Sequence, residues 1–187
     1  MSVIRCTSII GSYTERLTVP NRITRADGHA FTTYSPTYET YEPSLVDLVV
    51  REDGGLRLTC GRGTFPWQKQ SYPPSDPAPV VVPAVVLGLT HTFLALAGQL
   101  GDEHAAYQGQ WRLGLRVDRM RNVLAADKMS PGMGWYAHPY SRDDYVRVTS
   151  ASTGQLVETP REIAERLVAP LLRGLDVADT YIPVKPN

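Results

Sequence analysis

The sequence predicts an α+β fold in which a mainly antiparallel sheet packs against a long central apolar helix and a C-terminal helix. Three patterns predict it: alternating apolar residues within 45–61, an uncharged apolar stretch over 83–100, and an amphipathic pattern after Thr159. Alternation is typical of half-buried strands, and apolar spacing of three and four residues is typical of helices. The chain has 187 residues, which suits one domain of ordinary size.

We expect this domain to span 45–176, between an N-terminal arm over 1–44 and an extended C-terminal tail over 177–187. The arm is rich in Tyr and Thr and has low helical periodicity, so it predicts either an extended arm or irregular strands. A turn is expected at 26–29, where an aspartate precedes a glycine.

Residues 45–61 predict a β-hairpin. Apolar residues occupy alternate positions of both strands, namely Val46, Leu48 and Val50 in the first and Leu56, Leu58 and Cys60 in the second. Gly54 and Gly55 lie between them and tolerate the positive φ angles of a tight turn. The proline-rich segment 61–79 then predicts an irregular crossing to the long helix.

The stretch from Pro83 to Leu100 predicts a helix at the centre of the fold. It contains no formally charged side chain, unless His91 is protonated. A membrane-spanning helix needs about 20 apolar residues, and Thr90, His91 and Thr92 at the middle make this stretch a marginal candidate. Pro83 suits the first helical position. We therefore expect no membrane segment, and a helix that is apolar nearly all round and buried on most faces.

Two further strands are predicted at 111–117 and 145–149, where apolar and polar side chains alternate. The first should have an apolar face and an opposite face, formed by Leu113, Leu115 and Val117 and by Arg112, Gly114, Arg116 and Asp118 respectively. The segment 125–144 between them contains a Pro-Gly-Met-Gly run and predicts a long loop. The second of these strands leads towards the C-terminal helix.

Thr159, Pro160 and Glu162 predict the start of the C-terminal helix. Thr159 can accept a hydrogen bond from the Glu162 amide while the Glu162 side chain reaches back, which is a capping box. Pro160 suits the first helical position. Pro170 removes one backbone donor and is expected to kink the last turns, and Gly174 is expected to end the helix.

Charge and cysteine content limit the class of protein. Lys plus Arg number 19 and Asp plus Glu number 19, so the formal net charge is zero, whereas nucleic-acid modules normally carry a basic surplus. The two cysteines, Cys6 and Cys60, are too few for a disulfide scaffold and too far apart in sequence for a close zinc pair. The N-terminus has no signal-peptide pattern. We expect a cytoplasmic protein with reduced thiols.

His91 and the loop at 60–64 are the main candidates for a catalytic or ligand-binding site. His91 has no carboxylate within a turn and no second histidine four residues on, so a buried core histidine is favoured over a metal ligand. The loop carries two glycines beside an arginine and could cradle a phosphate. It lacks the length and the Lys-Ser/Thr ending of a P-loop, so a strand exit is favoured. Acidic residues at 102–103 and 143–144 lack metal-site spacing, and neither a metal nor a cofactor is expected.

Four arginines lie within ten residues: Arg112, Arg116, Arg119 and Arg121. Together with Arg62 they are candidates for contact with an anion or a nucleic acid. The zero net charge and the presence of Asp118 among them favour a solvated or salt-bridged face instead.

An aromatic group is a candidate for a protein interface. Its members are Trp135, Tyr136 and Tyr140 in the predicted loop, with Tyr38 and Tyr41 in the arm. Aromatic residues of this kind anchor protein interfaces and also stack on bases. Packing against the sheet is the alternative reading of the same residues.

Three stretches together resemble one known family. They are LRLTCGRGT at 56–64, WRLGLRV at 111–117, and the run from YVRVT at 145–149 through Thr159-Pro160 to LLRGL at 171–175. The pattern resembles the C-terminal region of actinobacterial Schlafen-type AlbA-family proteins, described as DNA-binding or ATP-binding. The resemblance covers about 45–176. It implies a partner or regulatory domain linked to nucleic-acid biology or defence, and implies no catalytic residue.

The favoured function is a non-enzymatic interaction or regulatory domain that assembles with itself or with another protein. One alternative is an enzyme, or a small-ligand or nucleotide-binding protein, that uses His91 or the 60–64 loop. The other is direct nucleic-acid binding through the four arginines at 112–121. A protein partner is therefore expected, and a nucleic-acid partner is not favoured.

Overall fold

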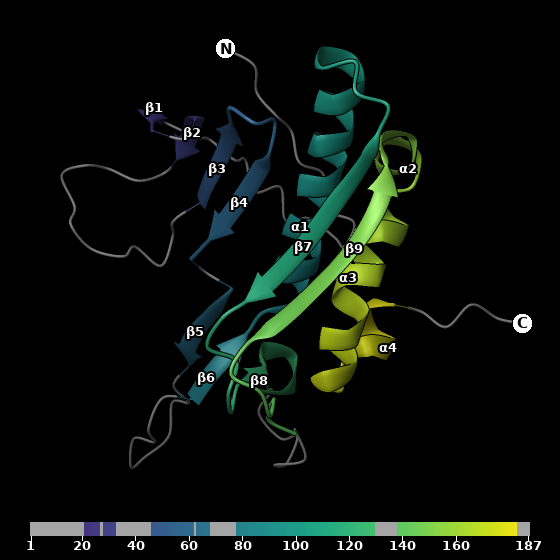
Figure 1. Ribbon diagram of the computed structural model, residues 1–187. Helices are drawn as coiled ribbons and strands as arrows, with labels where there is room; N and C mark the ends of the chain where they lie inside the picture. Colours follow the sequence, from purple (N-terminus) through teal and green to yellow (C-terminus); the bar gives the residue numbers. More distant parts are fainter. Residues whose placement is uncertain are drawn as a thin grey trace, which may run out of the picture. The chain divides into compact units, whose positions relative to one another are not determined.

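Antiparallel strands and helices make up the described chain, which confirms the predicted α+β class (Figure 1). The computed structural model describes residues 21–26, 28–32, 46–61, 63–67, 78–129 and 138–182. The chain divides into two compact units, Met1–Arg62 and Gly63–Asn187. The division falls inside the range 45–176 that the sequence predicts as one domain.

The first unit contains a four-stranded antiparallel sheet in the order β1-β2-β3-β4. Its strands are β1 (Asn21–Arg25), β2 (Gly28–Thr32), β3 (Val46–Arg51) and β4 (Leu56–Cys60). The pairing of Val46 with Cys60 and of Val50 with Leu56 confirms the predicted hairpin. The predicted turn at 26–29 joins β1 to β2. One face of the sheet buries Ala30 and Val49 completely.

The second unit begins with strands that the sequence does not predict. β5 (Thr64–Trp67) pairs antiparallel with β6 (Ala78–Val81), and β6 pairs in parallel with the two-residue β8 (Leu124–Ala125). The expected irregular crossing therefore contains two short strands. Pro66 and Pro79 are paired with each other in the register. Proline has no backbone N–H to donate, so the missing donors are confined to this one residue pair of the ladder.

The predicted central helix is α1 (Pro83–Gln99), followed by a π-helical turn, η1 (Leu100–His104). Six residues on one side of α1 are fully buried, namely Pro83, Val86, Leu87, Leu94, Ala97 and Gly98, and most of the others are half-buried. The expected burial on most faces is therefore complete on one side only. That side packs against α2 (Thr153–Glu158) and α3 (Pro160–Gly174). Pro83–His104 is long and apolar enough to cross a membrane, with a mean hydropathy of 1.5; core helices of soluble proteins share both properties.

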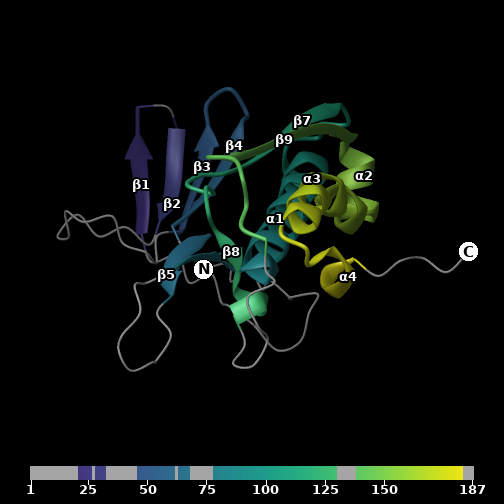
Figure 2. The same ribbon diagram turned by 90° about the horizontal axis from the view of Figure 1, so that it is seen from below.

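A two-stranded antiparallel ribbon covers the helices of this unit. It consists of β7 (Gln110–Val117) and β9 (Tyr145–Ser152), which were predicted from alternation. Helix α3 packs against both strands, and Figure 2 shows the ribbon on one side of α3 and α4 (Ala178–Tyr181) on the other. The buried hydroxyl of Tyr145 donates to the Leu167 carbonyl, which ties the ribbon to the helix.

Both ends of the ribbon are fixed by hydrogen bonds. At one end the indole nitrogen of Trp111 donates to the Thr153 hydroxyl at 3.0 Å. At the other end the loops around Met120 and Tyr140 join, because the Met120 amide donates to the Asp143 carbonyl at 2.6 Å. The predicted long loop at 125–144 starts with β8 and a 3-10 turn, η2 (Ala126–Met129). The ribbon is therefore held at both ends by its own unit.

The C-terminal helix starts at Pro160 and ends at Gly174 as predicted, and it continues through Pro170. The predicted capping box at Thr159 was wrong. Thr159 also ends α2, and its hydroxyl donates to the Gln155 carbonyl at 3.3 Å instead of capping α3. The tail differs as well, because α4 forms within the segment expected to be extended.

The capping box lies instead at the start of α2. The Ser152 hydroxyl accepts from the Gln155 amide at 3.2 Å, and the Gln155 side chain accepts from the Ser152 amide at 3.0 Å. We expect Ser152→Ala to lower the free energy of unfolding by about 1 kcal/mol, measured by chemical denaturation. Thr159→Ala is the matched control and should cost less, because its hydroxyl caps no helix N-terminus and donates to the Gln155 carbonyl, which the Thr159 amide already satisfies. Equal losses would contradict this assignment.

Candidate interaction surface

The outward face of the β7–β9 ribbon presents the candidate site. Side chains of a strand alternate between two faces, and the inward set includes the buried Leu113, Val117, Tyr145 and Ala151. The outward set forms cross-strand rows, listed from one end to the other: Arg112 with Ser150, Gly114 with Val148, and Arg116 with Val146. Asp118 and Asp144 extend the same face beyond the last paired residues. We call this set the ribbon face.

The centre of the ribbon face is apolar and open. Val146 is 61% exposed and Val148 50%, the two highest values among the large apolar residues of the described chain. Gly114 pairs with Val148, and a Cβ at Gly114 would meet no atom closer than 4.0 Å. The centre is thus a shallow notch beside two exposed valines.

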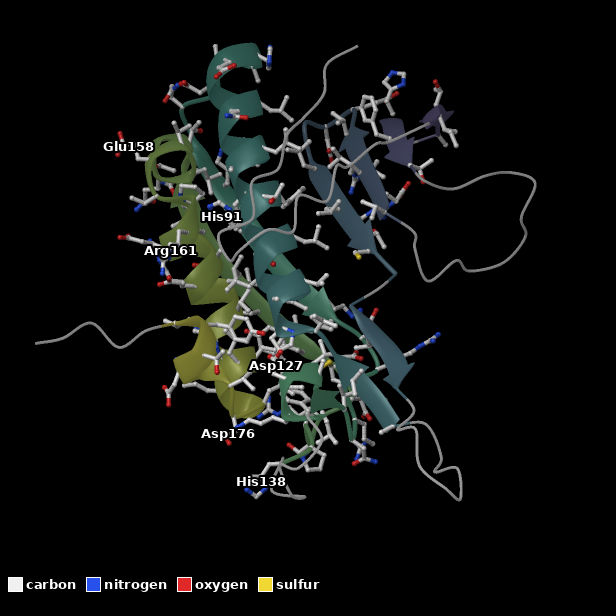
Figure 3. The ribbon with its side chains drawn as sticks, turned by 180° about the vertical axis from the view of Figure 1, so that it is seen from behind. His91, Asp127, His138, Glu158, Arg161 and Asp176 are labelled. Carbon is white, nitrogen blue, oxygen red and sulfur yellow. The ribbon has the colours of Figure 1, made fainter. Side chains whose placement is uncertain are left out.

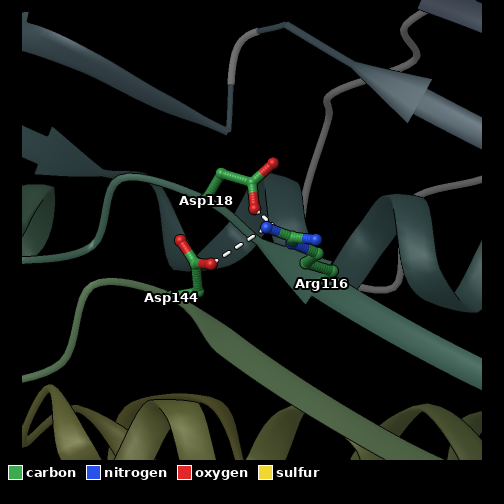
Figure 4. Close-up of polar contacts among 3 residues, drawn as sticks. All are labelled: Arg116, Asp118 and Asp144. Carbon is green, nitrogen blue, oxygen red and sulfur yellow. Dashed lines mark hydrogen bonds and ion pairs between the residues drawn. The ribbon is translucent and has the colours of Figure 1, made fainter.

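One end of the ribbon face carries an ion-paired cluster (Figure 4). The Arg116 guanidinium contacts Asp118 at 2.5 Å and Asp144 at 3.0 Å. The hydrogen bond from Arg116 to Asp118 and the charges of both aspartates raise the pKa of the guanidinium above its usual value. All three side chains remain substantially exposed, so the cluster fixes the position of Arg116 more than it adds stability.

The other predicted arginines differ in their pairing. Arg121 is bound by Asp143 at 2.5 Å, and this hydrogen bond lowers the pKa of the Asp143 carboxyl. Arg112 and Arg119 are exposed and make no ion pair with another described residue. Arg119 has a φ of 58°, an unusual conformation for a residue with a side chain. Two of the four arginines are therefore neutralised by neighbouring aspartates.

Tyr140 is the one member of the predicted aromatic group within the described residues. It is half-buried, and its amide donates to the Val123 carbonyl at 2.9 Å. Its ring lies close to Gly174, where a Cβ would be 3.0 Å from the ring. Tyr140 thus packs against the end of α3. The remaining predicted contacts lie outside the described residues: Tyr38, Tyr41, Arg62, Trp135 and Tyr136.

His91 lies on α1 and is half-buried (Figure 3). Burial lowers the pKa of its imidazole, and the positive charge of Arg161 on α3 lowers it further. Both effects favour the neutral form of the ring. Among the described residues, no group of three or more His, Cys, Asp or Glu side chains could hold a metal ion. Of the 60–64 loop, residue 62 lies outside the described chain.

A polar cavity of about 440 Å³ lies near the C-terminus of the second unit. It is lined by Lys128, Arg173, Asp176, Val177, Ala178, Asp179 and Thr180. Lys128 pairs with Asp176 at 3.2 Å, and the Tyr181 hydroxyl donates to Asp127 at 2.5 Å. Figure 3 labels the two aspartates. The charges of the two cations and the two carboxylates in its lining cancel. The cavity also lacks the predominantly apolar walls that are typical of small-molecule sites.

Comparison of the chain with protein-family models, with curated proteins and with solved structures finds no match. The ribbon face is therefore the feature from which a function can be assigned.

Sequence reasoning identified Arg112 and Arg116 on this face but missed its centre. Val146 and Val148 were interpreted as part of a half-buried strand, without deciding which of its faces lies outward. The sequence alone favours the opposite assignment, because Val146 and Val148 are the apolar set of this strand. Only the register with β7 and the burial of Tyr145 show that the two valines lie on the outward side. Gly114, in the middle of a predicted strand, was the one signal present in the sequence.

Proposed function

We propose that this protein is a non-enzymatic interaction domain that binds another polypeptide through the ribbon face. The observation that carries the proposal is the row formed by Gly114 and Val148. A glycine inside a strand is often the place where another backbone approaches closely. Beside it, two adjacent exposed valines offer apolar surface of the kind that interfaces cover.

The distribution of charge supports a polypeptide partner over a nucleic acid. Arg116 and Arg121 are bound by aspartates, so fewer free cations face outward than the four arginines in sequence suggest. Nucleic-acid binding depends on cations that are free to replace counterions around phosphate groups. The link to nucleic-acid biology that the family resemblance implies stays a prediction.

Site-specific photo-cross-linking tests this proposal. The photoreactive residue p-benzoylphenylalanine replaces Val148 in the full chain, which is irradiated both as purified protein and in an extract of cells that naturally make it. We expect a covalent adduct with a polypeptide, because the probe lies at the centre of the ribbon face. Adding Val146→Asp should strongly reduce the adduct, since it replaces apolar contact surface with a charged group that binding would have to desolvate.

Val157 provides the matched control position. It is another exposed valine, 44% exposed, and it lies on α2 away from the ribbon face. The same probe at Val157 should give no comparable adduct. If Val148 gives no more polypeptide adduct than Val157 in either setting, or reacts only with nucleic acid, the proposal is wrong.

A further inference from the structure

The ribbon face carries opposite charges at its two ends. Arg112 at one end is a single cation without an ion pair to another described residue. At the other end the two carboxylates of Asp118 and Asp144 share the single guanidinium of Arg116. The residues of the ribbon face itself therefore carry one net negative charge at that end; the neighbouring Arg119 is not counted among them. A positive end and a negative end thus flank the apolar centre.

A surface of this kind can bind a copy of itself. Symmetric dimers use the same patch of both subunits, so the patch must be complementary to itself under a two-fold rotation. Consider two copies stacked face to face, with the rotation axis between them and perpendicular to the strands. Each strand of one copy then lies over the same strand of the second copy and runs antiparallel to it. Arg112 of one copy then lies over the acidic end of the second copy, and the reverse holds at the other end.

For one position of this axis, every row of the ribbon face lies over a row of the second copy with complementary side chains. With the axis midway between the Gly114 and Arg116 rows, Arg112 lies over Asp118 of the second copy. Gly114 lies over Arg116 of the second copy, so the long arginine side chain lies over the position that has no side chain. On the other strand Val148 lies over Val146, which buries both exposed valines.

A rotation axis along the strands gives a poorer match. Each row then lies over the same row of the second copy, because the axis exchanges the two strands within a row. Asp118 of each copy would then lie over Asp144 of the other, which gives two pairs of like charges, and Arg112 would lie near no carboxylate. Like charges that face each other across an interface are unfavourable. The charges therefore select the antiparallel arrangement.

We infer that the partner of the ribbon face is a second copy of this chain, stacked face to face with antiparallel strands, with Arg112 of each copy bound by Asp118 of the other. This inference rests on the proposed function and names the partner of that same surface. The zero net charge of the chain adds no overall repulsion between copies.

The size of the face sets the expected strength. From residue 110 to residue 118 the ribbon extends about 27 Å, and two strands are about 10 Å wide. The resulting footprint of about 270 Å² is well below the roughly 800 Å² that each partner of a standard interface buries. We therefore expect a transient dimer with a dissociation constant in the micromolar range or weaker.

Sedimentation velocity of the purified full chain over a range of concentrations tests this inference. The wild-type chain should show a concentration-dependent monomer–dimer equilibrium that weakens with added salt. Arg112→Glu should weaken dimerisation by at least about tenfold, because two attractive pairs become repulsive. The double variant Arg112→Glu with Asp118→Arg restores opposite charges between the copies but also removes the ion pair between Asp118 and Arg116. Its dissociation constant should therefore be clearly lower than that of Arg112→Glu alone.

Arg166→Glu is the matched control, since Arg166 is exposed on α3 and makes no ion pair with another described residue; it should leave dimerisation unchanged. Circular dichroism establishes that each variant folds. A wild-type chain that stays monomeric overturns the inference, as does dimerisation that Arg112→Glu does not weaken or that the double variant does not partly restore. If Val148 cross-links only to a different polypeptide and the chain is monomeric, the inference fails while the proposed function stands.

Discussion

Replacing Leu94 by alanine should lower the free energy of unfolding by about 2–5 kcal/mol, the range for leucines deleted from well-packed cores. Leu94 is 1% exposed and belongs to the side of α1 that packs against α2 and α3. The loss combines the transfer of the missing methyl groups with the cavity they leave. Chemical denaturation followed by the circular dichroism of the helices measures it.

Leu89 provides the matched control on the same helix. It lies five residues before Leu94, on a different side of α1, and is only half-buried. Leu89→Ala should therefore cost clearly less than Leu94→Ala, because fewer contacts are removed. Equal losses from the two variants would mean that α1 is packed equally on both sides, which would contradict the one-sided burial of this helix.

The elements with strong periodicity could be predicted from the sequence. The strict alternation at 111–117 predicted β7 and assigned its side chains to the correct faces. The hairpin of β3 and β4 followed from alternation around two glycines. In each case a local pattern was sufficient, because alternate positions of a strand meet different environments.

Elements whose stability depends on distant partners could not be predicted in this way. β5 and β6 contain prolines, which argue against strands, yet Pro66 and Pro79 face each other and the ladder tolerates both. The capping box was assigned to Thr159 because its sequence fits the motif. Thr159 does not cap α3, because it also ends α2 and its hydroxyl donates to the Gln155 carbonyl. A capping box of the same kind forms at Ser152 and Gln155, at the start of α2.

The candidate site shows the same division. Alternation put Arg112 and Arg116 on one face, but the ion pair between Arg116 and Asp144 joins residues 28 positions apart. The sequence does not show which carboxylate reaches which arginine, because that depends on the register of β7 with β9. The charge difference between the ends of the ribbon face, and with it the antiparallel dimer, follows only from that register.

Gly28→Ala should have the second large effect, a loss of about 3 kcal/mol or more in the stability of the first unit. Gly28 has a φ of 145°, and an added Cβ would lie 2.1 Å from the Val50 carbonyl oxygen and 2.8 Å from the Arg51 Cα. Both are backbone atoms of β3, so β2 and β3 would have to separate where they pair. Hydrogen exchange of the β2 and β3 amides measures the loss directly.

Gly54 separates the steric effect from the effect of the dihedral angle. It also has a positive φ, 81°, but an added Cβ would meet nothing within 4 Å. Gly54→Ala should therefore cost only about 1–2 kcal/mol, the penalty for placing an ordinary residue in that conformation. If both variants weaken the sheet equally, the close approach of β2 to β3 does not determine its stability. A larger loss at Gly28 means that the antiparallel pairing of β2 and β3 requires a residue without a side chain at this position.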